Sequence, residues 1–304
     1  MDITIRQLRT IREIARLGTI AAAAESLGFT PSAVSQQMTA LESAVGVDVL
    51  ERIGRGVRLT DAGRALVDRA DSVLASIDET RAEIEQASGT PVGSVRLAVF
   101  ESFAVALLPD VVTRMRNAHP NVTVRSVQLD PDDAVGELLR GSCDLALVVD
   151  YAHAPSPRPR GVEWRVLRTE PFRLVVPIDD ELTGPVELAS VADRPFVSGS
   201  LETSCGRCTI NACRDSGFEP DIHHEIDQNT AALRAVASGA GVALLPDLAL
   251  VDAPPGVKFL DLVRPIDRTI ELAARPVTLQ RPAVQAVVAA IDEVAATQSS
   301  RCVA

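Results

Sequence analysis

The segment from Thr30 to Gly46 constrains the fold most, because it reads as a helix with one apolar face and one uncharged polar face. Val34, Met38 and Leu41 recur at helical spacing and predict a stripe that packs on a core. The opposite side carries only hydroxyl and amide side chains, namely Ser32, Ser35, Gln36, Thr39 and Ser43. Such groups match the mixed donors and acceptors of base edges in the DNA major groove. The alternative is a polar surface helix that binds nothing.

The residues around this helix predict a winged helix-turn-helix. Residues 5–17 and 20–27 form two further helical segments, which Gly18 and Gly28 terminate. Two helices joined by a short glycine-containing turn, the second polar on its outer side, are typical of a helix-turn-helix. Residues 47–60 then read as two short strands around a Gly-Arg-Gly turn. This wing carries Arg52, Arg55 and Arg58, which suit phosphates or a minor groove.

A long helix is expected to begin at Thr60-Asp61 and to reach about residue 88. Apolar and small side chains alternate in steps of four and three along it, at Leu66, Ala70, Val73, Ile77, Thr80 and Ile84. This heptad seam predicts pairing with the same helix of a second copy, and the alternative is packing on its own chain. Residues 61–89 are therefore interpreted as a dimerising linker helix.

The charge distribution is compatible with a local DNA-reading face. The 304 residues carry a net charge of -11, which argues against coating nucleic acid with the whole surface. Residues 1–66 nevertheless hold eight arginines against seven acidic residues, whereas residues 91–304 hold 20 basic and 28 acidic residues. No long apolar stretch or secretory signal is apparent, and five cysteines fit reduced thiols. We expect a cytoplasmic protein without a membrane partner.

Several motifs resemble the N-terminal signature of the LysR-type transcriptional regulators. They are AAAAESLGFTPSAVSQQM over residues 21–38, Leu41-Glu42, Leu50-Glu51-Arg52 and LTDAG over residues 59–63. The resemblance implies a winged helix-turn-helix over residues 1–60, with Ser35, Gln36 and Gln37 at groove-reading positions and Arg52 and Arg55 at backbone-contact positions. Double-stranded DNA is the expected partner. The candidate DNA-binding residues are Thr30, Ser32, Ser35, Gln36, Gln37, Thr39, Arg52, Arg55 and Arg58.

Beyond Pro91, short apolar runs alternate with helical stretches, which predicts parallel sheets with helices on both faces. Strands are expected over residues 95–100, 122–127, 145–149, 173–176, 196–197 and 242–245. Helices are expected over residues 104–117, 132–140, 209–216, 230–238 and 281–296. The fold class is thus an α/β chain with an N-terminal all-α winged helix-turn-helix.

The resemblance implies that residues 91–304 form a periplasmic-binding-protein-like α/β domain, which binds a small-molecule effector in a cleft. Subdomain I would cover residues 93–164 and 269–304, and subdomain II residues 165–268. Ligands of open α/β sheets lie outside the carboxyl ends of the strands. The candidate effector-binding residues are accordingly Ser102, Gln128, Asp150, Ser200, Thr203 and Asp227. Because Glu101, Asp130, Asp150 and Asp227 all follow strands, a cationic or zwitterionic effector is one hypothesis, and helix caps are the alternative.

The cysteines leave a second function open. Cys205, Cys208 and Cys213 lie close together in sequence, so a redox- or metal-responsive regulator is the alternative reading. Structural zinc usually needs paired knuckles, and only one CxxC is present, so buried thiols are favoured and no metal or cofactor is expected.

No sequence motif points to an enzyme, since a phosphate loop, a dinucleotide fingerprint and HExxH are all missing. We therefore expect a transcriptional regulator with no catalytic residues. It would bind a partly palindromic promoter site as a homodimer or homotetramer, with RNA polymerase as a further candidate partner. An architectural DNA-binding protein, whose C-terminal part only oligomerises, is a further alternative.

Overall fold

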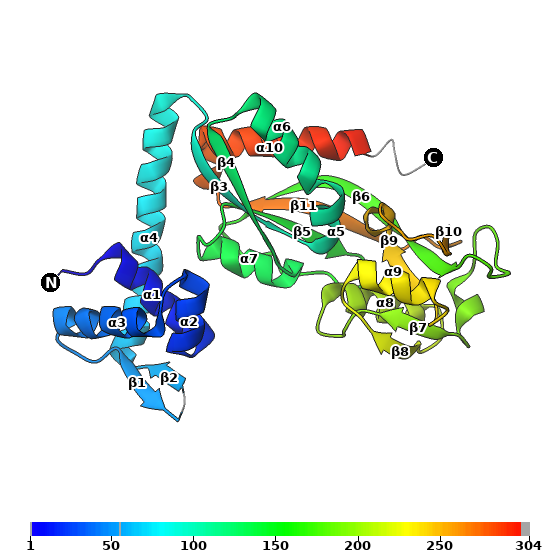
Figure 1. Ribbon diagram of the computed structural model, residues 1–304, viewed down its shortest axis with the longest axis horizontal. Helices are drawn as coiled ribbons and strands as arrows, with labels where there is room; N and C mark the ends of the chain where they lie inside the picture. Colours follow the sequence, from blue (N-terminus) through cyan, green and yellow to red (C-terminus); the bar gives the residue numbers. More distant parts are fainter. Residues whose placement is uncertain (1, 55, 299–304) are drawn as a thin grey trace. The chain divides into compact units, whose positions relative to one another are not determined.

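The computed structural model describes residues 2–54 and 56–298, without the side chains of residues 71, 72, 75, 78, 79, 81, 82, 86, 88 and 298 (Figure 1). The chain divides into two compact units, residues 1–81 and residues 82–304. Helix α4 (Asp61–Ser88) contributes residues to both. Each unit has its own hydrophobic core. No helix of the described residues is long and apolar enough to cross a membrane.

The first unit begins with three short helices, which are α1 (Ile5–Leu17), α2 (Ile20–Leu27) and α3 (Pro31–Val45). Threonine hydroxyls cap α2 and α3, because Thr19 Oγ1 accepts from the Ala22 N–H and Thr30 Oγ1 from the Ala33 N–H. All three helices end at glycines in the left-handed region, with φ of 70°, 69° and 78°. The predicted helix bounds are therefore confirmed.

The wing follows α3 as an antiparallel pair of strands, β1 (Leu50–Ile53) and β2 (Gly56–Leu59). The core beneath it contains Ile11, Ile14 and Leu41, each at most 1% exposed. Gly63, in the first turn of α4, lies against the backbone of Val49, where a Cβ would collide with the Val49 carbonyl. This close approach joins the wing to the start of α4.

The second unit is built on a seven-stranded mixed sheet in the order β10-β6-β11-β5-β3-β4, with β9 also paired to β6. Its strands are β3 (Gly93–Val99), β4 (Val122–Gln128), β5 (Leu145–Tyr151), β6 (Glu163–Pro177), β9 (Ala243–Pro246), β10 (Val257–Leu260) and β11 (Asp267–Ala274). Strand β3 is parallel to β4 and β5, as expected. The expectation of parallel sheets throughout is wrong, because β11 runs antiparallel to β5 and β6, and β6 is antiparallel to β9 and β10.

Helices cover both faces of this sheet, with α6 and α10 together on one face and α7 on the other (Figure 1). A smaller parallel pair, β7 (Pro195–Ser198) and β8 (Asp221–Glu225), is accompanied by α8 and α9. The helices are α5 (Glu101–Ala106), α6 (Leu108–Ala118), α7 (Pro131–Leu139), α8 (Ser204–Asp215), α9 (Asn229–Ala237) and α10 (Pro282–Gln298). Short 3-10 turns occur at Leu188–Val191, Asp247–Leu250 and Thr278–Gln280.

The single helix predicted over residues 104–117 is wrong, because two helices meet at Leu107. Pro109 lies in the first turn of the second helix, where its missing N–H has no helical partner to lose. A proline inside a continuous helix would instead remove a backbone hydrogen bond and clash with the preceding turn. The break therefore follows from the position of the proline.

Candidate functional site

Helix α3 presents its hydroxyl-and-amide face to solvent. Ser32, Ser35, Gln36 and Thr39 are all exposed. On the other side of the helix, Val34 is fully buried. The uncharged polar side chains are thus free of the core and available to another molecule.

Gln37 occupies a different position from these residues. Its side chain is half-buried, and its Oε1 accepts a hydrogen bond of 2.8 Å from the Thr10 hydroxyl of α1. Thr10 is itself fully buried. This contact ties α3 to α1 and favours a positioning role for Gln37 over a contact with a base.

The wing places Arg52 and Arg58 on exposed strand positions. Arg58 Nη2 lies 2.9 Å from Glu51 Oε1 across the two strands, so part of its charge is neutralised. Arg55 lies outside the described residues. Glu42 on α3 holds the wing in place, because its Oε1 accepts from the backbone N–H groups of Val49 and Leu50 at 3.0 and 3.2 Å.

The second unit contains a cavity of about 190 Å³ at the carboxyl ends of β3, β4 and β5. Four of the six predicted effector residues line it, namely Ser102, Gln128, Thr203 and Asp227. Ser200 adjoins it through its backbone N–H, which donates to Asp227 Oδ1 at 2.8 Å. Asp150 lines a different cavity. The expected cleft thus brings together most, but not all, of the predicted residues.

The sequence reasoning missed Arg268, which lines this cavity and is only 3% exposed. Its Nη2 donates to the Ser102 hydroxyl at 2.8 Å, and its Nε donates to Glu170 Oε1 at the same distance. Its guanidinium also lies 5.2 Å from the centre of the Phe100 ring. Glu170 is fully buried beside it, and Arg168 Nη2 lies 3.2 Å from the other oxygen of the same carboxylate, so Glu170 compensates only one of the two arginine charges. Arg268 is near the start of β11, so a correct prediction of this strand could have pointed to Arg268 as a buried residue.

The carboxylates around the cavity have different tasks. Glu101 accepts from the backbone N–H groups and side chains of both Asn229 and Thr230, so it caps α9. Asp130 and Asp227 remain directed at the cavity. Burial raises the pKa of the Asp130 carboxyl, and the charges of Asp132, Asp133 and Asp227 raise it further. The cap alternative therefore holds for Glu101, and also for Asp130, whose Oδ1 accepts from the Asp132 N–H at the start of α7.

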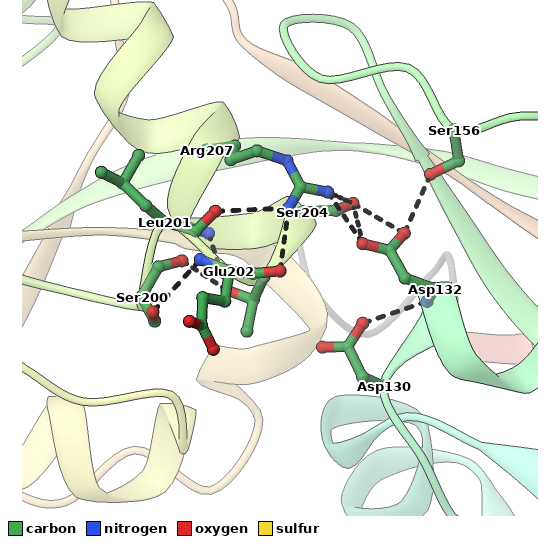
Figure 2. A network of polar contacts seen from close by, with 10 residues as sticks. Asp130, Asp132, Ser156, Ser200, Leu201, Glu202, Ser204 and Arg207 are labelled. Atoms are coloured by element: carbon green, nitrogen blue, oxygen red, sulfur yellow. Dashed lines mark hydrogen bonds and ion pairs between the residues drawn. The ribbon is translucent and has the colours of Figure 1, made fainter. Parts of the chain in front are cut away.

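A polar network joins α7 to α8 beside this cavity (Figure 2). Asp132 accepts from the Ser204 hydroxyl and from Arg207 Nη2, both at 2.8 Å, and from the Ser156 hydroxyl at 3.2 Å. Gly206 lets the first turn of α8 approach the Ser200 backbone, where a Cβ would collide with the Ser200 carbonyl. The contacts of Ser204 and Arg207 with Asp132 thus hold α8 against α7.

The environment of the described cysteines favours protonated thiols. Burial raises the pKa of Cys208 and of Cys213 to about 12, and burial also raises the pKa of Cys205. The reactive thiolate is thus disfavoured at neutral pH. All four described cysteines are free, and no group of His, Cys, Asp or Glu among the described residues could hold a metal ion. The geometry does not favour the redox- or metal-responsive alternative.

An exposed hydroxyl-and-amide helix within a winged helix-turn-helix, together with an α/β domain that encloses a polar cavity, defines a ligand-responsive DNA-binding regulator. Comparison with known families agrees. The helix-turn-helix family described as "Bacterial regulatory helix-turn-helix protein, lysR family" matches residues 5–64, and "LysR substrate binding domain" matches residues 88–296. The chain belongs to the LysR family of bacterial transcriptional regulators, and it is a DNA-binding regulator with an effector-binding domain, not an enzyme.

Individual relatives extend along most of the chain. A "Probable HTH-type transcriptional regulator LrrA" from Synechococcus elongatus is 30% identical over 283 residues, which cover 92% of this chain and 93% of that protein. A "Probable hydrogen peroxide-inducible genes activator" from Mycobacterium leprae is 30% identical over 253 residues, covering 81% and 78%. The crystal structure of CbnR, a LysR family transcriptional regulator, has a TM-score of 0.56 at 26% identity and covers 95% of this chain and 100% of its own.

Proposed function

We propose that this regulator binds a partly palindromic promoter site as a homodimer or homotetramer and responds to a small-molecule effector in the α/β cleft. Residues 1–60 would read the DNA, residues 61–89 would dimerise, and residues 91–304 would sense the effector. In that last part, subdomain I would comprise residues 93–164 and 269–304, and subdomain II residues 165–268. RNA polymerase would be a further partner, and a regulator that binds DNA in this way would act in the cytoplasm.

The observation that carries the proposal is the exposed, uncharged face of α3 next to the arginines of the wing. Hydroxyls and amides can donate to and accept from base edges, and a carboxylate on this face would repel phosphates. Two copies of so small a reader would recognise two half-sites, which explains a partly palindromic site. CbnR, whose fold this chain shares, has been solved in a complex with its target DNA.

The cleft supports a cationic or zwitterionic effector. Asp130 and Asp227 both line the cavity, and the charge of Asp227 disfavours the ionised form of Asp130. A cation between them would relieve this repulsion. The Arg268 guanidinium donates to Ser102 and to Glu170, a carboxylate that it shares with Arg168. Effector binding would change the DNA-bound arrangement only if the ligand binds one arrangement more tightly than the other.

The DNA-reading face is tested by replacing Ser35 and Gln36 with alanine in the full chain. Binding is measured by fluorescence anisotropy to a duplex that the unmodified protein has selected from a random-sequence pool. We expect each replacement to weaken specific binding by roughly tenfold, because one base contact contributes about 1–3 kcal/mol of discrimination. Binding to a random duplex should change little. A Gln280→Ala variant, which alters an exposed amide of the second unit, is the matched control and should bind like the unmodified protein.

Retention of specific binding by both α3 variants would contradict the proposal. A thermal-shift screen of metabolites with the full chain separates it from an architectural role. A sensor is stabilised by at least one small molecule, and an architectural protein by none.

A further inference from the structure

We infer that the protein has a second small-molecule site, outside the effector cleft, that takes an organic cation with a flat apolar body. The site is a cavity of about 370 Å³ bounded by α7, by the loop after β5 and by strands β5, β6 and β11. It shares only Pro131 with the lining of the cleft cavity. The inference does not depend on the proposed promoter site or on the identity of the effector.

A buried carboxylate forms the polar end of this cavity. The Glu271 side chain is 4% exposed, and both its oxygens accept from Arg158 Nη2, at 2.9 and 3.0 Å. Burying a carboxylate is costly unless a cation compensates it. The pairing of β11 with β6 shifts register between Ile270 and Glu271, and such irregularities re-aim side chains next to binding sites.

Arg158 fills the polar end with a guanidinium that belongs to the chain itself. Its guanidinium carbon lies 5.4 Å from the centre of the Trp164 ring, and its Nη2 is 3.4 Å from Asp150 Oδ2. A planar cation over an aromatic ring and against carboxylates is the arrangement that binds amidines, guanidines and amines. The Arg158 guanidinium thus already occupies the polar end of the cavity, and it is a planar cation like the charged end of the ligand that we propose.

The balance of charge selects a cation over an anion. Arg207, the other basic residue in the lining, is paired with Asp132, so it is engaged within the network of Figure 2. An incoming anion would meet Glu271 and Asp150, whereas an incoming cation would replace Arg158. The Arg158 side chain is 49% exposed, so its charged group can return to water at small cost.

The remainder of the cavity suits a flat apolar body. Trp164 offers an indole face, and Val135 and Pro157 line the cavity beside it. A small aromatic cation would stack on the indole while its charged end met Glu271. Asp132, Ser156 and Arg207 form another part of the wall, so an occupant would lie against the contacts that join α7 to α8 (Figure 2).

Three near-isosteric probes test the charge preference in the full-length protein: benzamidine, benzamide and benzoate. Isothermal titration calorimetry should show benzamidine binding at least about tenfold more tightly than benzamide, since charge-assisted hydrogen bonds are the stronger ones, and benzoate should not bind. Trp164 is the only tryptophan of the chain, so benzamidine should also change the tryptophan emission. Tighter binding of benzoate than of benzamidine would overturn the inference.

Variants of the polar end locate the site. Arg158→Gln keeps a donor for Glu271 but removes the cation that competes for the Trp164 ring. We therefore expect benzamidine to bind about fivefold more tightly, which is the order of magnitude of one cation–π contact. Arg160→Gln removes an exposed arginine of the same loop and should leave the affinity unchanged. Glu271→Gln should lower the affinity for benzamidine to that for benzamide. If the Glu271 variant does not fold, Asp150→Asn replaces it as the test and should also weaken benzamidine binding.

Two further results would overturn the assignment. The first is weaker binding of benzamidine to Arg158→Gln, since that would make Arg158 a clamp and not a competitor. The second is a loss of benzamidine binding in Asp227→Asn but not in Glu271→Gln or Asp150→Asn, since that would place the ligand in the effector cleft. Neither result bears on whether the protein reads promoter DNA.

Discussion

Asp130 has two roles that oppose each other. Its Oδ1 accepts from the Asp132 N–H at 3.0 Å and caps α7, which favours a charged carboxylate. Burial outweighs this and raises its pKa above the ordinary value of 3.8, with Asp132, Asp133 and Asp227 adding to the effect. The carboxylate that lines the cleft is thus kept in an environment that disfavours its charge, as ligand-binding residues often are.

The raised pKa of Asp130 predicts a pH-dependent difference in stability. The folded state holds this proton more tightly than the unfolded state, so the contribution of Asp130 to the free energy of unfolding falls as pH rises from 3.8 through its raised value. Asp130→Asn keeps a side chain that can cap α7 but removes the carboxyl group that titrates. Relative to the unmodified protein, the variant should therefore gain stability with rising pH over this window. Urea unfolding at a series of pH values measures the difference.

The neighbouring carboxylate provides the control for this experiment. Asp133→Asn removes one negative charge from the same exposed turn of α7 without touching the capping group. It should produce a smaller change. A stability difference for Asp130→Asn that stays constant with pH, or that shrinks as pH rises, would show that burial does not control this carboxyl.

Helix α4 leaves part of its apolar seam uncovered by its own chain. Val73 and Ile84 are 46% and 67% exposed, although both belong to the heptad pattern. Ala70, from the same pattern, is 1% exposed, so part of the seam is covered within the chain. Large exposed apolar side chains at heptad positions are typical of a helix that pairs with another. The structure thus leaves the dimerising role of residues 61–89 as a proposal with a defined surface.

Replacing Ile84 with serine should weaken self-association. Each dimer would lose two buried apolar side chains, and about 1.5–3 kcal/mol per side chain raises the dissociation constant at least about tenfold. Light scattering after size-exclusion chromatography over a concentration series measures this. Asp68→Ser, on the opposite side of the helix, should leave the dissociation constant unchanged. Equal effects of the two substitutions would show that the seam does not pair.

The elements also show why some of the fold could be predicted and some could not. Local signals define the first unit, because threonine caps and terminal glycines mark each helix boundary. The strands β8, β10 and β11 were not predicted. Their positions depend on pairing between residues far apart in sequence, and β11 carries Arg268 and Glu271 at positions that are buried.

That gap accounts for what was missed in the two cavities. Arg268 in the cleft and Glu271 in the second cavity are charged residues in a strand whose apolar pattern they interrupt. Periodicity alone counts such residues as surface positions. Their partners, Glu170 and Arg158, lie about a hundred residues earlier in the chain, so no local pattern indicates that the charges are compensated.

At the scale of the whole molecule, basic charge is concentrated where the proposed function needs it. The chain carries -11 overall, yet the first 66 residues contain eight of its 30 basic residues and only seven of its 41 acidic ones. A protein with this distribution gains affinity for DNA from few phosphate contacts. Its DNA binding should therefore depend only moderately on salt concentration, compared with regulators that are basic throughout.

The number of phosphate contacts can be counted from this salt dependence. The logarithm of the binding constant falls linearly with the logarithm of the salt concentration, with a slope of about -0.9 for each phosphate contacted. Arg52 is an exposed residue of the wing, so Arg52→Ala should make the slope shallower by about one for each subunit on the DNA and should weaken specific and random duplexes alike. Arg116→Ala, which removes an exposed arginine of α6, should leave the slope unchanged.

If both variants changed the slope equally, the phosphate contacts would extend to the second unit. If neither changed it, Arg52 would not contact the phosphate backbone, and the proposed role of the wing would be wrong while the role of α3 remained open to its own test.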